Sequence, residues 1–290
     1  MATAAQTFYG VSTLHDFTSA DVLAGRVIKI NPALVTLTDG LIGKVEPQAI
    51  QQRIWEQVND LLSYRIRTLH VDLNFDDYSG FGRERPQNNL AVFTPPFLER
   101  LNNLIRSVGG FLNLHLLTDA PERHLARLAP LAPGAICFQL EVVNDPSALE
   151  QLIQRITDLG ACASPVIETV GGEHLRPLSP QQVRALLLPL APRLGMLTLQ
   201  AAGTASRSNL PMGVFAQEAV SSYLQALPQA FRGTLQIQGG ITMQTIGLAV
   251  QIGAEFLVCG TQLFRNPAGF SPRIVVDRML LEAARVLKGR

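Results

Sequence analysis

Short apolar runs alternate with longer segments of helical periodicity from about residue 27 onward. The runs are rich in β-branched or large apolar side chains and have the length of strands that are buried on both faces. They predict eight strands, at 27–37, 68–74, 111–117, 135–140, 162–167, 196–199, 234–238 and 255–259. Amphipathic segments that open with Pro, or follow Ser, Thr or Asp, predict the helices between them. These segments are 48–64, 96–108, 146–159, 180–190, 213–227 and 242–252.

This alternation indicates repeated βα units, and therefore a parallel sheet with crossover helices. Such a sheet can close into a barrel or remain open and doubly wound. The absence of a GxGxxG turn after the first predicted strand favours the closed barrel. With 290 residues and no linker, the chain is expected to be one α/β domain, a (β/α)8 or TIM barrel, with residues 1–26 as an N-terminal extension.

Composition narrows the classes of partner. Apolar residues make up 47% of the chain and charged residues 16%, which agrees with a large buried core. The net charge is +1 and the basic residues are scattered, so the sequence predicts neither a nucleic-acid surface nor a membrane surface. No apolar run is long enough to span a bilayer, and the first residues do not resemble a signal peptide. A cytoplasmic protein that binds a small molecule is expected.

The cysteines support that location. Cys137, Cys162 and Cys259 each lie inside an apolar run, and none belongs to a CxxC or another spacing typical of metal ligands. We expect them to be reduced residues of the core.

Polar side chains at the ends of two predicted strands form the first candidate site. His70 and Asp72 are two residues apart in a strand and must point to the same face, which in a barrel is the lumen. His115 lies at the corresponding end of the next strand, on the face where barrel enzymes have their active sites. Two imidazoles and a carboxylate suit Zn, Mn or Fe, although each histidine could instead be a hydrogen-bonded residue of the barrel mouth. The remaining histidines lie outside strand ends and are expected to be solvated: His15, His124 and His174.

Glycines close the last two predicted strands and form the second candidate site. Gly239 and Gly240 follow the seventh strand, and Gly260 and Thr261 follow the eighth. Glycine lets a ligand approach the backbone, and the N–H groups that open the following helices favour an anion. The loops after strands seven and eight are the usual phosphate site of this fold, although glycines also simply form tight turns.

An ordered set of motifs between Ile30 and Pro267 resembles the ribulose-phosphate 3-epimerase family. The most specific part is IQGGI at 237–241 followed by VCGTQLF at 258–264, which resembles VDGGV followed by VAGSAIF. The other matches are INPAL at 30–34 with IAPSIL, HVD at 70–72 with HxD, AVFTPPF at 91–97 with ITFGPPF, LHL at 114–116 with VHLM, and FQLE at 138–141 with FHxE.

The resemblance implies a barrel of the ribulose-phosphate-binding type whose substrate is a phosphorylated ketopentose. It makes His70, Asp72 and His115 the ligands of a divalent metal that stabilises an enediolate. In the family two aspartates on opposite faces of the substrate relay a proton, and Asp72 corresponds to one of them. The resemblance also makes Gly239, Gly240, Gly260 and Thr261 the phosphate contacts, and it implies a homo-oligomer.

The departures from the family pattern alter the expected chemistry. Gln238 stands where the family has its second catalytic aspartate, and a carboxamide neither takes nor gives a proton at neutral pH. Ala33, Asn74 and Gln139 replace the family's serine, methionine and histidine, and residues 202–209 replace its glycine-rich loop after strand six. These changes indicate a ligand different from the family's.

Nearby residues could supply the missing functions. Glu168, at the end of strand five, is the candidate for the second acid, with Glu141 as the alternative, and Arg207 could hold a second anionic group. An exposed residue in any of these positions could also be simply solvated.

Three functions follow from these observations. The first is a metal-dependent epimerase or isomerase-like enzyme acting on a small phosphorylated sugar. The second is a non-catalytic barrel that binds a sugar phosphate. The third is a metal-dependent aldolase or decarboxylase, which is disfavoured because the related decarboxylases use a DxK motif and Asn74 stands in place of the lysine.

Overall fold

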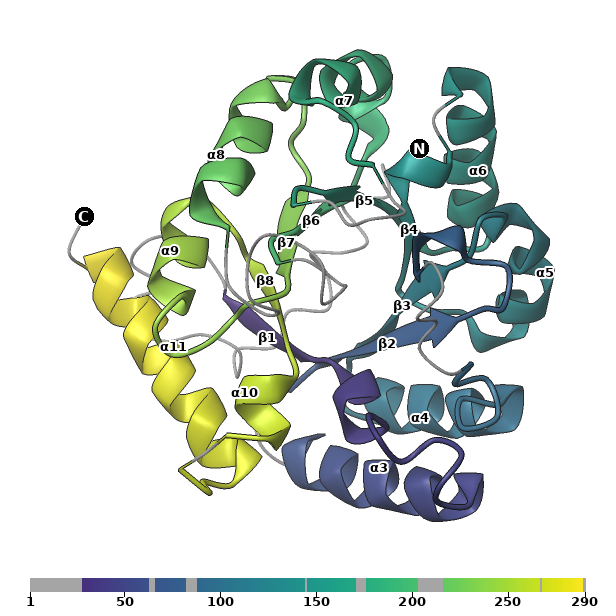
Figure 1. Cartoon of the computed structure of the whole chain (residues 1–290), viewed down its shortest axis with the longest axis vertical. Coiled ribbons are helices and arrows are strands. Elements are labelled where there is room, and N and C mark those ends of the chain that lie inside the picture. The colour runs from purple at the N-terminus through teal and green to yellow at the C-terminus, as the bar shows by residue number, and fades with distance from the viewer. Residues whose placement is uncertain are drawn as a thin grey trace.

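The computed structural model of the chain describes residues 28–62, 66–81, 88–143, 145–170, 176–202, 216–266 and 268–288. Within them, eight parallel strands form one sheet in the order β1-β8-β7-β6-β5-β4-β3-β2. A parallel bridge between Ala33 and His70 links the end of β1 to β2, so the sheet nearly closes on itself. Figure 1 shows the strands as a central ring with the helices around it. The predicted (β/α)8 barrel is confirmed.

The strands are β1 (Lys29–Pro32), β2 (Thr68–Asn74), β3 (Phe111–Leu117), β4 (Ala135–Gln139), β5 (Cys162–Glu168), β6 (Met196–Gln200), β7 (Thr234–Gln238) and β8 (Phe256–Cys259). The α-helices are α3 (Pro47–Leu62), α4 (Pro95–Ser107), α5 (Leu125–Leu128), α6 (Pro146–Asp158), α7 (Pro180–Leu187), α8 (Gln217–Ala226), α9 (Ile246–Gln251), α10 (Thr261–Phe264) and α11 (Pro272–Lys288). Short 3-10 helices include η2 (Leu34–Leu37), η3 (Ser79–Phe81) and η6 (Leu140–Val142).

The first strand is shorter than the apolar pattern predicts. The prediction of a strand over 27–37 is wrong after Pro32, because residues 34–37 form η2. Thr38 closes this turn, since both its backbone N–H and its hydroxyl donate to the carbonyl oxygen of Val35. Leu34 and Leu37 are buried in this 3-10 turn. Their apolar side chains therefore produce the same sequence pattern as a buried strand, although the backbone is not extended.

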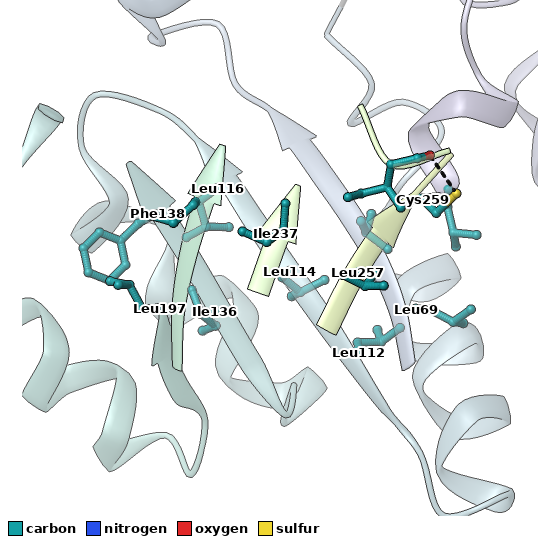
Figure 2. Packing of buried hydrophobic residues seen from close by; sticks show 14 of the residues in the cluster. Leu69, Leu112, Leu114, Leu116, Ile136, Phe138, Leu197, Ile237, Leu257 and Cys259 are labelled. Carbon is teal, nitrogen blue, oxygen red and sulfur yellow. Dashed lines mark hydrogen bonds between the residues drawn. The ribbon is translucent and has the colours of Figure 1, made fainter. Parts of the chain in front are cut away.

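The main hydrophobic core lies between the sheet and the helices. Alternate residues of each strand face outward, and in β3 these are Leu112, Leu114 and Leu116, all fully buried. Figure 2 shows them beside outward-facing residues of other strands, with a dashed line from the Cys259 thiol to the carbonyl oxygen of Ile241, 3.5 Å away. All three cysteines are free and buried, as expected from their apolar surroundings.

The lumen of the barrel is polar at mid-height, although the interior of this fold is usually filled by branched apolar side chains. A small apolar cluster that includes Met196 and Phe256 fills the lower end. Above it lie polar side chains with no exposed surface: Asn31, His70, Asn113, Ser164, Thr198 and Gln236. A polar interior of this kind needs a complete set of hydrogen-bond partners, which bears directly on the site above it.

Several predictions from the sequence concern residues outside the described ranges: the N-terminal extension at 1–26, His15, His174, Arg207 and most of the loop at 202–209. Among the residues that are described, no helix is both long enough and apolar enough to cross a membrane.

Candidate metal and substrate site

His70, Asp72 and His115 meet at the carboxyl ends of β2 and β3. The two strands pair with Asp72 directly opposite His115, and His70 shares the face of Asp72 because it is two residues earlier. The side chains are buried, with 0%, 6% and 1% of the residue surface exposed for His70, Asp72 and His115 respectively. The structure therefore brings together the three residues that the sequence predicted as metal ligands.

The two histidines both contact one carboxylate oxygen of Asp72. Oδ1 of Asp72 lies 3.2 Å from Nε2 of His70 and 2.8 Å from Nδ1 of His115. Gln238, at the end of β7, completes the group from across the lumen: its Nε2 lies 3.3 Å from Oδ1 of Asp72 and 3.4 Å from Nδ1 of His115. Four side chains from three strands thus present polar atoms to one small volume.

The spacing of these atoms fits a small tetrahedral cation. Zinc binds nitrogen and oxygen ligands at about 2.0–2.1 Å, and a tetrahedron of that radius has edges of about 3.3 Å. Four of the six separations among these atoms are between 2.8 and 3.4 Å, and the ligand atoms of His70, Asp72 and His115 all lie within 4.8 Å of one another. Oε1 of Gln238 is buried without a hydrogen-bond partner, and a half-turn of the carboxamide would exchange it with Nε2. The donor set therefore fits a divalent metal, with Gln238 as a neutral fourth group.

The protonation of His70 gives a second reason to expect a cation. Its Nδ1 lies 3.1 Å from Oδ1 of Asn113, and an amide oxygen can only accept a hydrogen bond. Nδ1 therefore carries a proton, and in the neutral ring Nε2 carries a lone pair. That lone pair faces Oδ1 of Asp72, which is also an acceptor. Two acceptors this close repel each other unless a proton or a metal ion lies between them.

The electrostatics of the site keep Asp72 ionised. Burial alone would raise the pKa of Asp72, but the imidazoles of His70 and His115 outweigh it and hold the pKa well below its ordinary value. Burial also lowers the pKa of His115, despite its contact with Asp72, which favours the neutral ring. A carboxylate beside a neutral imidazole is the protonation pattern that a metal ligand set requires.

A second group of acids lies at the ends of β4 and β5. Glu168 is 1% exposed, and its backbone N–H donates to Oε1 of Glu141 at 2.9 Å. Burial, reinforced by the charge of Glu168, raises the pKa of Glu141 to about 8. Tyr78 and Tyr223 lie close enough that both carboxylates add to the burial that raises their pKa values. At neutral pH this group therefore holds at least one carboxyl proton.

The glycines of the predicted phosphate site directly follow two adjacent strands. β7 pairs with β8, and the two following loops are connected by the backbone N–H of Met243, which donates to Oε1 of Gln262 at 3.3 Å. Gly239 and Gly240 have φ values of +88° and +69°, in the region that favours glycine. At Gly260 a β-carbon would lie 2.0 Å from Oγ1 of Thr36. Gly239 and Gly240 are thus favoured by the turn, and Gly260 by the close approach of Thr36, whatever they bind.

The sequence did not identify Asn113 or Gln236 as part of the site. A signal was present, because Asn113 is two residues before His115 and must share its face. Gln236 has the same relation to Gln238. The partners of both residues depend on strand pairing across the barrel, which periodicity does not reveal.

No family model matches the sequence. The ribulose-phosphate 3-epimerase of Candida glabrata is 25% identical over 194 residues, which cover 66% of this chain and 70% of the relative. The enzyme of the same name from Schizosaccharomyces pombe is 24% identical over 72% of this chain and 80% of its own length. The chain is a divergent relative of the ribulose-phosphate 3-epimerases. The resemblance in the motifs is confirmed at that level.

Solved structures with low sequence identity share the barrel. The α subunit of tryptophan synthase from Legionella pneumophila gives a TM-score of 0.57 at 11% identity, with both chains covered completely. The 3-hexulose-6-phosphate synthase of Salmonella typhimurium gives 0.55 at 14% identity, covering 90% of this chain and 99% of its own. These similarities support the fold alone. Any argument about the reaction has to come from the residues of the site.

Proposed function

We propose that this barrel is a metal-dependent epimerase or isomerase-like enzyme that acts on a phosphorylated sugar. The observation that carries the proposal is the convergence of His70, His115 and Gln238 on one buried oxygen of Asp72, at the end of the barrel where such enzymes react. The distant similarity to two ribulose-phosphate 3-epimerases supports the same class of substrate.

Asp72 is the proposed base. Its low pKa keeps it ionised at neutral pH, so it can accept a proton from the carbon next to a sugar carbonyl. The same low pKa makes Asp72 a weak base, so the pKa of the C–H group next to the carbonyl must be lowered before Asp72 can remove its proton. A divalent metal held by His70, Asp72 and His115 would supply this effect by polarising the carbonyl and stabilising negative charge on its oxygen.

Glu168 is the proposed acid on the other face of the substrate, since Gln238 cannot exchange a proton there. Glu141 supports this role, because it touches the backbone of Glu168 and, with its pKa near 8, keeps a proton at neutral pH. The proton transfer that the family assigns to a residue of β7 is thereby moved to β4 and β5. In the same proposal, Arg207 holds a second anionic group.

The phosphate of the sugar is proposed to bind at the loops after β7 and β8, through the backbone of Gly239, Gly240, Gly260 and Thr261. Positive φ values at the first two turn the chain sharply at the barrel mouth, and the link between Met243 and Gln262 holds the loops together. A homo-oligomer in the cytoplasm stays a prediction from the sequence and the family.

The test combines metal analysis of the purified protein with an assay for interconversion of ribulose 5-phosphate and xylulose 5-phosphate. We expect bound divalent metal and turnover in the wild type, loss of turnover in Asp72→Asn, and loss of metal in His115→Ala. His124→Ala is the matched control, because His124 stacks on Phe75 outside the site and should leave the metal bound. Full activity in Asp72→Asn, or stoichiometric metal in His115→Ala, would refute the assignment.

A non-catalytic sugar-phosphate-binding protein is the second candidate, and one contact favours it. The amide of Gln238 donates to Asp72, which satisfies the carboxylate with a neutral group. In this case a sugar phosphate raises the melting temperature of the wild type without turnover. Turnover that appears only in Gln238→Asp would support this second function over the first.

A further inference from the structure

We propose that Asn113 is a positioning residue that fixes the tautomer of His70 and thereby directs the Nε2 lone pair of His70 at the metal site. The proposal rests on the proposed metal-dependent function, since it concerns how the ligand set is prepared. It adds to the site a residue that touches neither substrate nor metal. The argument comes from the hydrogen bonds of the polar lumen below the ligands.

The contact between the two side chains is fully buried. Nδ1 of His70 lies 3.1 Å from Oδ1 of Asn113, and neither residue has exposed surface. With the proton on Nδ1, the pair forms a hydrogen bond. With the proton on Nε2 instead, the Nδ1 lone pair would face the amide oxygen, and both groups would be left as buried acceptors. The contact therefore selects the Nδ1–H tautomer.

The orientation of the Asn113 amide is itself determined by its neighbours. Its Nδ2 donates to Oε1 of Gln236 at 2.8 Å, and the same oxygen accepts from Nδ2 of Asn31 at 3.4 Å. Nε2 of Gln236 donates in turn to the hydroxyl of Thr198 at 3.0 Å, and that hydroxyl lies 2.8 Å from the hydroxyl of Ser164. A reversed Asn113 amide would place its oxygen against the oxygen of Gln236.

A thiol reinforces the same orientation. Sγ of Cys137 lies 3.1 Å from Oδ1 of Asn113 and donates to it. Burial is the main cause that raises the pKa of Cys137 to about 12, so the thiol keeps its proton in the physiological range. Oδ1 of Asn113 thus accepts from two sides, and the chain of amides, hydroxyls and thiol carries no formal charge.

The consequence appears on the other side of the imidazole. Because Asn113 holds the proton on Nδ1, the lone pair on Nε2 of His70 faces Oδ1 of Asp72 at 3.2 Å. Two hydrogen-bond acceptors therefore meet at the proposed metal site. A proton or a metal ion between the two atoms relieves their repulsion there. Partners of this kind, one step removed from the metal, fix the tautomer of ligating histidines, and their loss typically weakens metal binding by about 10–100-fold.

The experiment compares Asn113→Leu with Asn31→Leu in the full chain. Both remove a fully buried amide of the same size from the same lumen; Asn113 hydrogen-bonds His70 directly, whereas Asn31 reaches this network through a long 3.4 Å contact with Gln236. Histidine ¹⁵N NMR of the metal-free protein reports which ring nitrogen of His70 is protonated. Competition with a zinc chelator gives the zinc affinity, and thermal melting is followed separately.

We expect the Nδ1–H tautomer in the wild type and in Asn31→Leu. In Asn113→Leu we expect a change toward Nε2–H, with zinc affinity lower by about 10–100-fold. Asn113→Asp should restore the tautomer, because a carboxylate oxygen accepts from Nδ1 of His70 as the amide oxygen does.

An Nε2–H tautomer in the wild type would overturn the proposal, even if Asn113→Leu does not fold. Identical His70 spectra in Asn113→Leu and Asn31→Leu would overturn it as well. If the wild type binds no zinc but the tautomers differ as expected, the proposed metal-dependent function fails while the positioning role of Asn113 stands.

Discussion

Substitution of Glu141 by glutamine should remove the pH dependence of stability that results from burial of this carboxyl group. Glu141 is 9% exposed, and burial raises its pKa to about 8 from an ordinary value of 4.5. Glu168 on β5 adds to this effect, while the backbone N–H groups of Glu168 and of Glu141 itself oppose it. Glutamine keeps an oxygen that can accept the 2.9 Å hydrogen bond from Glu168 but cannot ionise.

The sign follows from the proton count of the two states. Between the unfolded and the folded pKa, the folded protein holds a proton on Glu141 that the unfolded chain has lost. This stabilisation is therefore complete below 4.5 and is lost as the pH rises through about 8. Since one pKa unit corresponds to about 1.4 kcal/mol, the free energy of unfolding of the wild type should fall by about 4 kcal/mol relative to Glu141→Gln between about pH 5 and about pH 9.

Urea denaturation of both proteins across this pH range measures the effect. Taking the difference between them cancels groups that titrate in both, including His115, whose lowered pKa costs stability as the pH falls. Glu150→Gln is the control, because Glu150 is exposed on α6 and pairs with Arg193 on the surface. If the stability curves of wild type and Glu141→Gln run parallel, Glu141 is not a proton-holding group and its support for Glu168 is lost.

Two further substitutions test the backbone around the site. Gly260→Ala should lower the melting temperature by several degrees, since its β-carbon would lie 2.0 Å from Oγ1 of Thr36. An unchanged melting temperature in calorimetry would show that the loops after β1 and β8 move apart without cost. Ser179→Ala should cost about 1 kcal/mol in urea denaturation because it removes the capping box with Gln182 at the start of α7; a loss below about 0.3 kcal/mol would contradict this.

The sequence predicted the barrel and the proximity of the three candidate metal ligands for the same reason. Strands buried on both faces form short apolar runs, and their alternation with helical segments is visible without any tertiary contact. The meeting of these three residues was predictable because His70 and Asp72 share a strand and His115 ends the next one, so only neighbouring strands had to be assumed parallel. The structure adds the register that places Asp72 opposite His115.

Features that depend on distant strand pairing were not predictable. The hydrogen bond between Asn113 and Gln236 joins residues 123 positions apart, and the contact between Asn31 and Gln236 spans 205 positions. None of the three residues breaks the periodicity of its strand, so each resembles an ordinary polar side chain until the barrel closes. The prediction of a strand after Pro32 was wrong for a local reason. The buried residues of this 3-10 turn have the same apolar pattern as a strand.

Gln238 connects the departure in sequence to the distribution of charge in the site. With neutral imidazoles, Asp72 supplies the one negative charge of the four-residue group, whereas a carboxylate at Gln238 would supply a second. A divalent cation held by the present set would keep a net positive charge and attract an anionic oxygen more strongly. The same change removes the group that would move a proton from β7. Under the proposed function, such a site stabilises charge at β2 and β3 and depends for proton transfer on the buried acids of β4 and β5.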